Sequence, residues 1–253
     1  MRAASFAWRA GDASAVGGGV GLNVLVFDID GTLTETNRVD GHYFKSAIQA
    51  AIPSLVLESF SGFVEMTDTA ILRQIVSEQG LGDYERIEEV VQHHFVRGLR
   101  DALEDDPRSF TAVAGAPDVF SAARHSGWVP AVATGGWRPS AELKLEAAGI
   151  PMRGVPLATA SEADRRVEII RLAVAAACGG TAPSEVVYVG DGSWDARACR
   201  ELGIGFIGRA ESEQEIRLRQ LGARVVLPDF LDPGALRSAL AVVEELRLSE
   251  GEA

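Results

Sequence analysis

Lysine is scarce in this sequence. Only Lys45 and Lys144 are lysines among 24 basic residues, while acidic residues number 36 and the formal net charge is -12. Binding to nucleic acid or to an anionic membrane surface depends on a basic surface, so the composition argues against both as partners. The other basic residues are arginines, and we expect an arginine wherever the function needs a cation. An anionic small substrate stays open, because one metal ion can reverse the sign of a local field.

Cysteine and long apolar runs are scarce as well. Cys178 and Cys199 stand alone, outside any metal-binding spacing, and predict two reduced core thiols in a cytoplasmic protein. No run approaches the ~18 apolar residues of a transmembrane helix. Residues 1–22 are rich in Ala and Gly, and Arg9 and Asp12 interrupt any signal-peptide core. We therefore expect a disordered tail or an over-extended start there.

The order of the expected elements indicates an α/β fold. Residues 23–27 are apolar and typical of a strand buried on both faces. Further along the chain, strands alternate with helices of about ten to fifteen residues, which predicts a mainly parallel sheet with helices on both faces. The expected strands are 129–133, 155–159 and 186–189, and the expected helices are 117–125, 140–148 and 164–177, with others near Asp195, Glu213 and Gly234.

A helical stretch separates the first strand from the rest. Residues 84–103 keep their apolar positions on one face, as an amphipathic helix does. A shorter helix is expected after Thr67 or Asp68, either of which could be its N-cap. We expect an inserted helical cap domain at 38–107 and a catalytic core formed by 23–37 with 108–253.

Polar residues follow three of the expected strands. Asp28 and Asp30 follow the first, Thr134 follows the second, and Asp191 and Asp195 follow the strand at 186–189. Each alone also fits a turn or a helix start, but their joint occurrence after buried strands favours a site at the carboxyl edge of the sheet. Four carboxylates brought together would repel one another, and an all-oxygen set of ligands suits Mg²⁺.

The motifs D-I-D-G-T-L-T at 28–34, A-T-G-G at 133–136 and G-D-G-S-W-D at 190–195 resemble three of the four motifs of the haloacid dehalogenase superfamily. The resemblance covers the chain from residue 23 on and implies a Rossmann-like core with a mobile cap. The helical insertion after the first motif resembles the helical-cap branch, which includes phosphoglycolate-phosphatase-like enzymes.

The resemblance also implies a role for each residue. Asp28 would be the nucleophile that takes the phosphoryl group, and Asp30 would act as general acid and then as general base. Asp28 and Asp191 would bind Mg²⁺ through their side chains, Asp30 through its backbone carbonyl, and Asp195 directly or through water. Thr134 would hold a phosphoryl oxygen. The dehalogenases of the superfamily lack the aspartate at the position of Asp30, so its presence favours phosphorus chemistry.

The third motif, usually a lysine followed by proline, departs from the family pattern. Lys144 is the only lysine between the second and fourth motifs, and we expect it to face solvent from a helix. Arg165 and Arg166 are better candidates for the phosphoryl-binding cation. We predict Arg166, because it shares a helix face with Ile169 and Ile170, which should pack on the sheet.

These observations predict a Mg²⁺-dependent phosphatase acting on a small phosphorylated metabolite. A phosphotransferase or phosphomutase of the same superfamily stays an alternative, as does a non-catalytic binding protein on the same scaffold, against which the intact Asp28, Asp30 and Asp191 argue. Residues 62–68 resemble the loop that other helical-cap members place over the active site, where the mutases tend to use a basic residue. This loop contains no Lys or Arg, which weakens the mutase interpretation. Asp68 in that loop is expected to serve as a helix N-cap without substrate contact. The substrate and the oligomeric state are left open.

Overall fold

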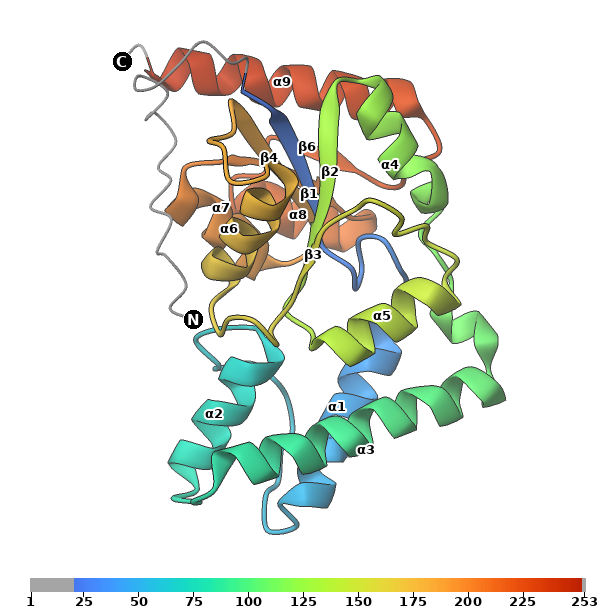
Figure 1. Ribbon diagram of the computed structural model, residues 1–253, viewed down its shortest axis with the longest axis vertical. Helices are drawn as coiled ribbons and strands as arrows, with labels where there is room; N and C mark the ends of the chain where they lie inside the picture. Colours follow the sequence, from blue (N-terminus) through green and yellow to red (C-terminus); the bar gives the residue numbers. More distant parts are fainter. Residues whose placement is uncertain (1–20, 252–253) are drawn as a thin grey trace.

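The computed structural model describes residues 21–251, with side chains as far as residue 245. The tail predicted for residues 1–22 lies outside this part of the chain except for its last two residues. Six parallel strands in the described range form one sheet in the order β3-β2-β1-β4-β5-β6, which confirms the predicted α/β fold (Figure 1). The strands are β1 Asn23–Phe27, β2 Trp128–Ala133, β3 Leu157–Ala158, β4 Glu185–Gly190, β5 Gly205–Arg209 and β6 Val225–Leu227.

Helices cover both faces of the sheet, as a parallel sheet requires. Val24 and Val26 of β1 face the layer that contains α6 and α7, whereas Leu25 and Phe27 face the layer that contains α4 and α9. Both sets are fully buried, so β1 is a central strand without a polar face. The helices outside the insertion are α4 Ala116–His125, α5 Arg138–Ala147, α6 Arg166–Ala177, α7 Ser193–Leu202, α8 Ser212–Gln220 and α9 Pro233–Gly251, with a 3₁₀ turn at Pro107–Phe110.

The inserted residues 37–105, which we call the helical segment, lie at the carboxyl end of the sheet (Figure 1). They form α1 Asn37–Ala51, α2 Asp68–Glu78 and α3 Tyr84–Asp105. The helix predicted over 84–103 is confirmed, with one buried apolar face. Phe44 and Phe95 pack against Trp137 at ring-centroid distances of 5.5 and 6.4 Å, so the segment shares a core with the sheet. Its assignment as a separate cap domain stays a prediction.

None of the helices in the described range is long and apolar enough to cross a membrane.

Candidate active site

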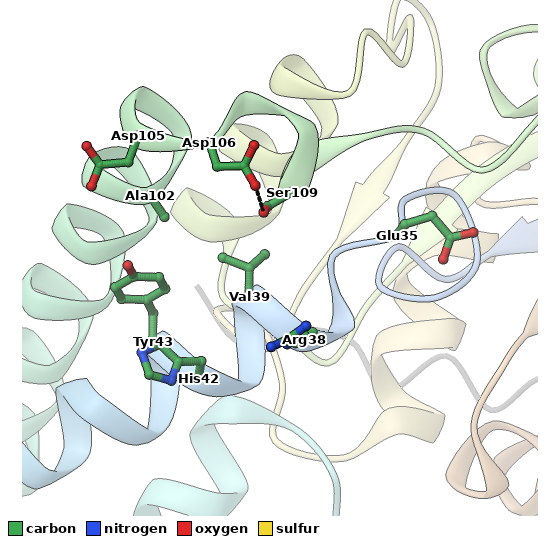
Figure 2. A pocket seen from close by; sticks show the side chains of 9 residues that line it. All are labelled: Glu35, Arg38, Val39, His42, Tyr43, Ala102, Asp105, Asp106 and Ser109. Carbon is green, nitrogen blue, oxygen red and sulfur yellow. Dashed lines mark hydrogen bonds between the residues drawn. The ribbon is translucent and has the colours of Figure 1, made fainter.

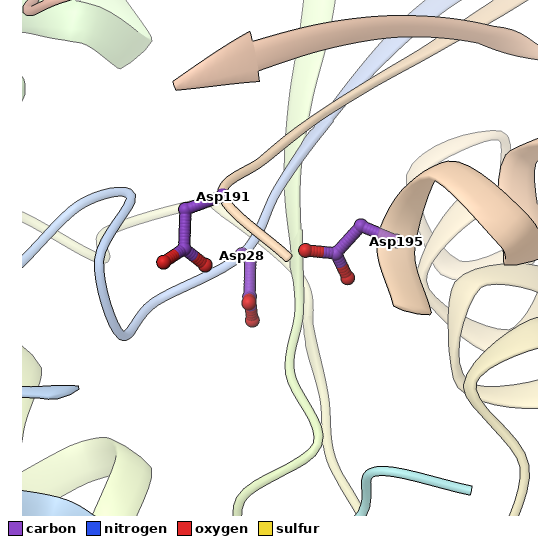
Figure 3. Close-up of side chains that lie close together, drawn as sticks. All are labelled: Asp28, Asp191 and Asp195. Atoms are coloured by element: carbon purple, nitrogen blue, oxygen red, sulfur yellow. The ribbon is translucent and has the colours of Figure 1, made fainter. Parts of the chain in front are cut away.

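Asp28, Asp191 and Asp195 meet at the carboxyl edge of the sheet. Asp28 directly follows β1, Asp191 directly follows β4, and Asp195 lies in the first turn of α7. One carboxylate oxygen of each lies within 4.8 Å of the others, and all three residues are buried (Figure 3). The parallel pairing of β1 with β4 brings the first two together, because Phe27 is in register with Val189.

A tight turn after β1 makes room for Asp191. The backbone N–H groups of Thr32, Leu33 and Thr34 all donate to the carbonyl of Ile29, at 2.9–3.1 Å. Gly31 has a φ of 74°, in the left-handed region, and a Cβ there would overlap the carboxylate of Asp191. A glycine is therefore required at this position.

The three carboxylates are crowded in a way that a cation would relieve. Burial, and then the charge of Asp28, raise the pKa of Asp191 to about 7. Burial also raises the pKa values of Asp28 and Asp195, against the lowering effect of Arg166. Asp191 Oδ1 and Asp195 Oδ1 are buried and receive no hydrogen bond from any described residue. Buried oxygens that receive no hydrogen bond are free to act as metal ligands. Mg²⁺ prefers oxygen ligands of this kind. These residues therefore fit the metal that the sequence predicts.

The structure places Arg166 inside this cluster. Its Nη1 lies 3.2 Å from Asp28 Oδ1 and 3.4 Å from Asp195 Oδ1, and it donates to the Tyr188 hydroxyl at 3.3 Å. Burial lowers the pKa of Arg166, but the two carboxylates more than offset this and hold it above its ordinary value. Arg165, in contrast, has a side chain that is 48% exposed and pairs with surface glutamates. The two neighbouring arginines therefore have different surroundings.

Lys144 does not face solvent, so that prediction was wrong. Its side chain is completely buried, and Nζ donates to Asp30 Oδ2 and to Asp40 Oδ1, both at 2.5 Å. Burial lowers the pKa of Lys144, but the two carboxylates together raise it above its usual value, so the ammonium group is charged. The face of α5 that was expected to be open is covered by the helical segment. Lys144 lies three residues after the buried Ala141, and this spacing was a signal that could have located it.

Two further carboxylates at the site were not predicted. Asp40 of α1 has its pKa raised to about 6 by burial and by the charge of Asp30. Asp68 is buried, and burial followed by the charge of Asp40 raises its pKa well above the ordinary value. Thr67, not Asp68, is the N-cap of α2, since its hydroxyl accepts a hydrogen bond from the N–H of Ala70. Asp68 instead accepts a hydrogen bond from the backbone N–H of Trp137 at 2.9 Å.

A small cavity of about 160 Å³ joins these groups. It contains Asp28, Asp30, Thr134 and Arg166 at the edge of the sheet, together with side chains from the helical segment. Trp194 also lines it, and the buried indole N–H has no partner among the described residues. The lining residues from 37–71 are Asn37, Asp40, Gly41, Phe44, Phe60, Met66, Asp68 and Ile71.

A larger hollow of about 610 Å³ lies elsewhere, between α1 and the end of α3 (Figure 2). Its lining includes Arg38 and His42 of α1, and Asp106, which accepts a hydrogen bond from Ser109 at 2.9 Å. None of the strand-end residues lines it. The chemistry of the lining, rather than the volume, therefore identifies the 160 Å³ cavity as the candidate active site.

Comparison with known proteins identifies the family of this chain. Residues 22–203 match the family model of the haloacid dehalogenase-like hydrolases. The chain belongs to this family. No curated protein sequence matches it.

Solved structures share the fold at low sequence identity. A hydrolase from Pseudomonas syringae is 22% identical, with a TM-score of 0.64 over 83% of this chain and 94% of the other. CbbY from Rhodobacter sphaeroides in complex with phosphate is 22% identical, with a TM-score of 0.59 over 84% and 96%. A β-phosphoglucomutase from Clostridium difficile is 14% identical, with a TM-score of 0.64 over 87% and 98%.

Proposed function

We propose that this hydrolase is a Mg²⁺-dependent phosphatase that acts on a small phosphate monoester through an aspartyl phosphate on Asp28. One observation carries the proposal. Asp28, Asp191 and Asp195 are buried together, with two carboxylate oxygens that lack donors, and Arg166 lies against two of the three. A nucleophilic carboxylate, a set of metal ligands and a fixed cation are what phosphoryl transfer through an aspartate requires.

The first step forms the intermediate. A carboxylate oxygen of Asp28 attacks phosphorus in line, and the bond from phosphorus to the ester oxygen breaks. The electron pair stays on the leaving oxygen, which takes the proton of the Asp30 carboxyl group. Asp30 lines the same cavity and is held by Thr36, whose hydroxyl donates to it at 2.6 Å.

The second step releases phosphate. Water loses a proton to the Asp30 carboxylate while its oxygen bonds to phosphorus. The bond from phosphorus to Asp28 breaks, and both aspartates return to their starting states. Arg166 and the hydroxyl of Thr134 hold phosphoryl oxygens through both steps in this proposal.

The metal ligands in this proposal are the side chains of Asp28 and Asp191, the backbone carbonyl of Asp30, and Asp195 directly or through water. When bound, Mg²⁺ supplies positive charge that offsets the carboxylates and the phosphoryl oxygens. The buried and unpaired thiols of Cys178 and Cys199 support a cytoplasmic location as part of the same proposal.

Phosphate release from acetyl phosphate tests the proposal, because this substrate is small and has a good leaving group. We expect release with Mg²⁺, none with EDTA, and a phosphoenzyme after acid quenching. Full activity in a metal-free preparation would exclude the metal, and turnover without any phosphoenzyme would exclude the covalent step. Adding a small alcohol separates the phosphotransferase alternative, since a transferase would produce a phosphate ester in place of free phosphate.

A further inference from the structure

The cavity has two chemically different ends. Asp28, Thr134 and Arg166 form the end where the phosphoryl group is placed by the proposed function. The other end is formed by the helical segment, including Asp40, Asp68 and aromatic side chains. The leaving group of the substrate must therefore lie among residues of the helical segment.

No cation at that end is available to bind an anion. Among the described residues that line the cavity, Arg166 is the only arginine or lysine, and its guanidinium group is paired with Asp28 and Asp195. The ammonium group of Lys144 is already held between Asp30 and Asp40. A carboxylate or second phosphate in the leaving group would find no free cation among the described lining residues and would face like charge.

The charges at that end instead suit a positive group. Lys144 contributes one positive charge against the three carboxyl groups of Asp30, Asp40 and Asp68. Lys144 and Asp68 are buried, and the side chains of Asp30 and Asp40 are partly buried. Burial and mutual repulsion raise the pKa values of Asp40 and Asp68, as expected for carboxylates that lack enough positive charge. An ammonium group beside them would supply it.

Aromatic side chains support the same conclusion. Phe44 and Phe60 line the cavity and stack at a centroid distance of 5.7 Å. The face of an aromatic ring attracts a cation, and more strongly in a desolvated site. The volume of about 160 Å³ is below the ~300–1,000 Å³ that drug-sized ligands occupy, so the leaving group must be small.

We infer that the substrate is the phosphate ester of a small amino alcohol, with its protonated amine beside Asp40 and Asp68. This inference rests on the proposed phosphatase function and identifies the class of its leaving group.

Three substrates of matched length test the inference on the Mg²⁺-loaded protein. They are phosphoethanolamine, 2-hydroxyethyl phosphate and phosphoglycolate, whose two-carbon leaving groups end in an amine, a hydroxyl and a carboxylate. We expect kcat/KM to decrease in that order, with at least about a tenfold difference between the first and the last, since contacts between like charges are costly in a buried site. Equal values, or a preference for phosphoglycolate, would overturn the inference.

The variant Asp68→Asn then tests where the preference arises. Asparagine keeps an oxygen that can accept the hydrogen bond from Trp137 but removes the charge. We expect the ratio of phosphoethanolamine to phosphoglycolate turnover to fall by at least about threefold, because the ammonium group of phosphoethanolamine loses the negative charge of Asp68 as its buried partner. Asp101→Asn, at an exposed position in α3, is the matched control and should keep the wild-type ratio. An unchanged ratio in Asp68→Asn would overturn the placement of the amine.

Acetyl phosphate separates this inference from the proposed function. Its hydrolysis together with a flat or inverted preference among the three esters would overturn the amino-alcohol inference and leave the phosphatase standing. No hydrolysis of any of the four compounds would overturn both.

Discussion

Two clusters at the candidate active site have the same composition, three carboxylates and one buried cation, but are assembled differently. In the first cluster, Asp28, Asp191 and Asp195 surround Arg166, and all four come from the core of the sheet and its flanking helices. The second consists of Asp30, Asp40, Asp68 and Lys144 and joins the core to the helical segment. We call them the core cluster and the bridging cluster.

The two clusters differ in which of their polar atoms lack hydrogen-bond partners. The core cluster leaves Asp191 Oδ1 and Asp195 Oδ1 without hydrogen-bond donors among the described residues, and the Nε of Arg166 is buried without an acceptor. In the bridging cluster, Lys144 donates to Asp30 and to Asp40. Unsatisfied oxygens of ordered carboxylates suit a metal ion, whereas the paired bridging cluster suits fixing the helical segment over the site. The following predictions test this division of roles.

The largest expected effect is on the core cluster. Asp28→Asn keeps the shape of the side chain but removes the nucleophilic charge, so kcat should fall by at least about 10⁴-fold and no phosphoenzyme should be trapped. Acid quenching with labelled substrate measures both. Asp118→Asn, exposed on α4, serves as the control and should behave as wild type. A phosphoenzyme that persists in Asp28→Asn would assign the nucleophile to another carboxylate.

Asp30 contacts Lys144 in the bridging cluster, but its proposed role is to transfer protons during catalysis. Asp30→Asn should lower kcat by about 10²–10⁴-fold with an alkyl phosphate, as expected for loss of a general acid. The loss should be smaller with acetyl phosphate, since acetate leaves without a proton. Asp40→Asn is the matched control, because it also removes a partner of Lys144 but should not distinguish the two substrates. Equal losses of Asp30→Asn with both substrates would contradict the role in proton transfer.

Lys144→Met tests whether the bridging cluster is structural. Methionine fills similar space but leaves the partly buried carboxylates of Asp30 and Asp40 without their cation, so the free energy of unfolding should fall by about 3–5 kcal/mol. Urea denaturation measures it. Lys45→Met is the control, since this more exposed lysine contacts only a backbone carbonyl among the described residues, and its effect should stay within about 0.5 kcal/mol. Adding Asp40→Asn to Lys144→Met should recover part of the loss, and similar stability in the two single lysine variants would refute the argument.

The two adjacent arginines give a sharper contrast at the core cluster. Arg166→Ala should lower kcat/KM by about 10²-fold, since a charge held against the transferring phosphoryl group acts in the transition state. Arg165→Ala should change it several-fold at most, because this side chain is half exposed and pairs with Glu65 and Glu201. Steady-state kinetics on both variants decide the matter. If the larger loss occurred in Arg165→Ala, the assignment of Arg166 would be wrong.

The core cluster could be anticipated from sequence, because each member is tied to a local pattern. Asp28 and Asp191 come directly after runs of buried β-branched and apolar residues, and parallel strands end at the same edge of a sheet. The edge strand was less regular than expected. A strand over 155–159 was predicted, but β3 has only two residues, Leu157–Ala158, and Pro156 has no N–H to donate.

The bridging cluster could not be anticipated, because its partners are distant in sequence. Lys144 is 104 residues from Asp40 and 114 from Asp30. A helical pattern shows which residues share a face, but not that a separate segment will cover it. Asp68 was similarly interpreted as a local cap, whereas its partner is the backbone of Trp137 in another element.

The smallest expected effect concerns pH and separates the clusters by their response to metal. The pKa of Asp191 is raised from its ordinary value to about 7, so between about pH 4 and pH 7 the folded protein binds more protons than the unfolded chain. Stability therefore falls as the pH rises through this range, and the cost is fully present above pH 7. Without metal, we expect Tm to be lower at pH 8 than at pH 5.5.

Mg²⁺ needs ionised ligands, so it should raise Tm more at pH 8 than at pH 5.5, by at least about 2 °C at a concentration well above its Kd. The pKa of Asp40, raised to about 6, also makes stability fall as the pH rises. Mg²⁺ should leave this contribution unchanged, since Lys144 already pairs with Asp40. Asp191→Asn should reduce the slope and the response to Mg²⁺ together. Thermal melts at the two pH values measure this, and an equal Mg²⁺ effect at both would show that the core cluster does not bind the metal through these carboxylates.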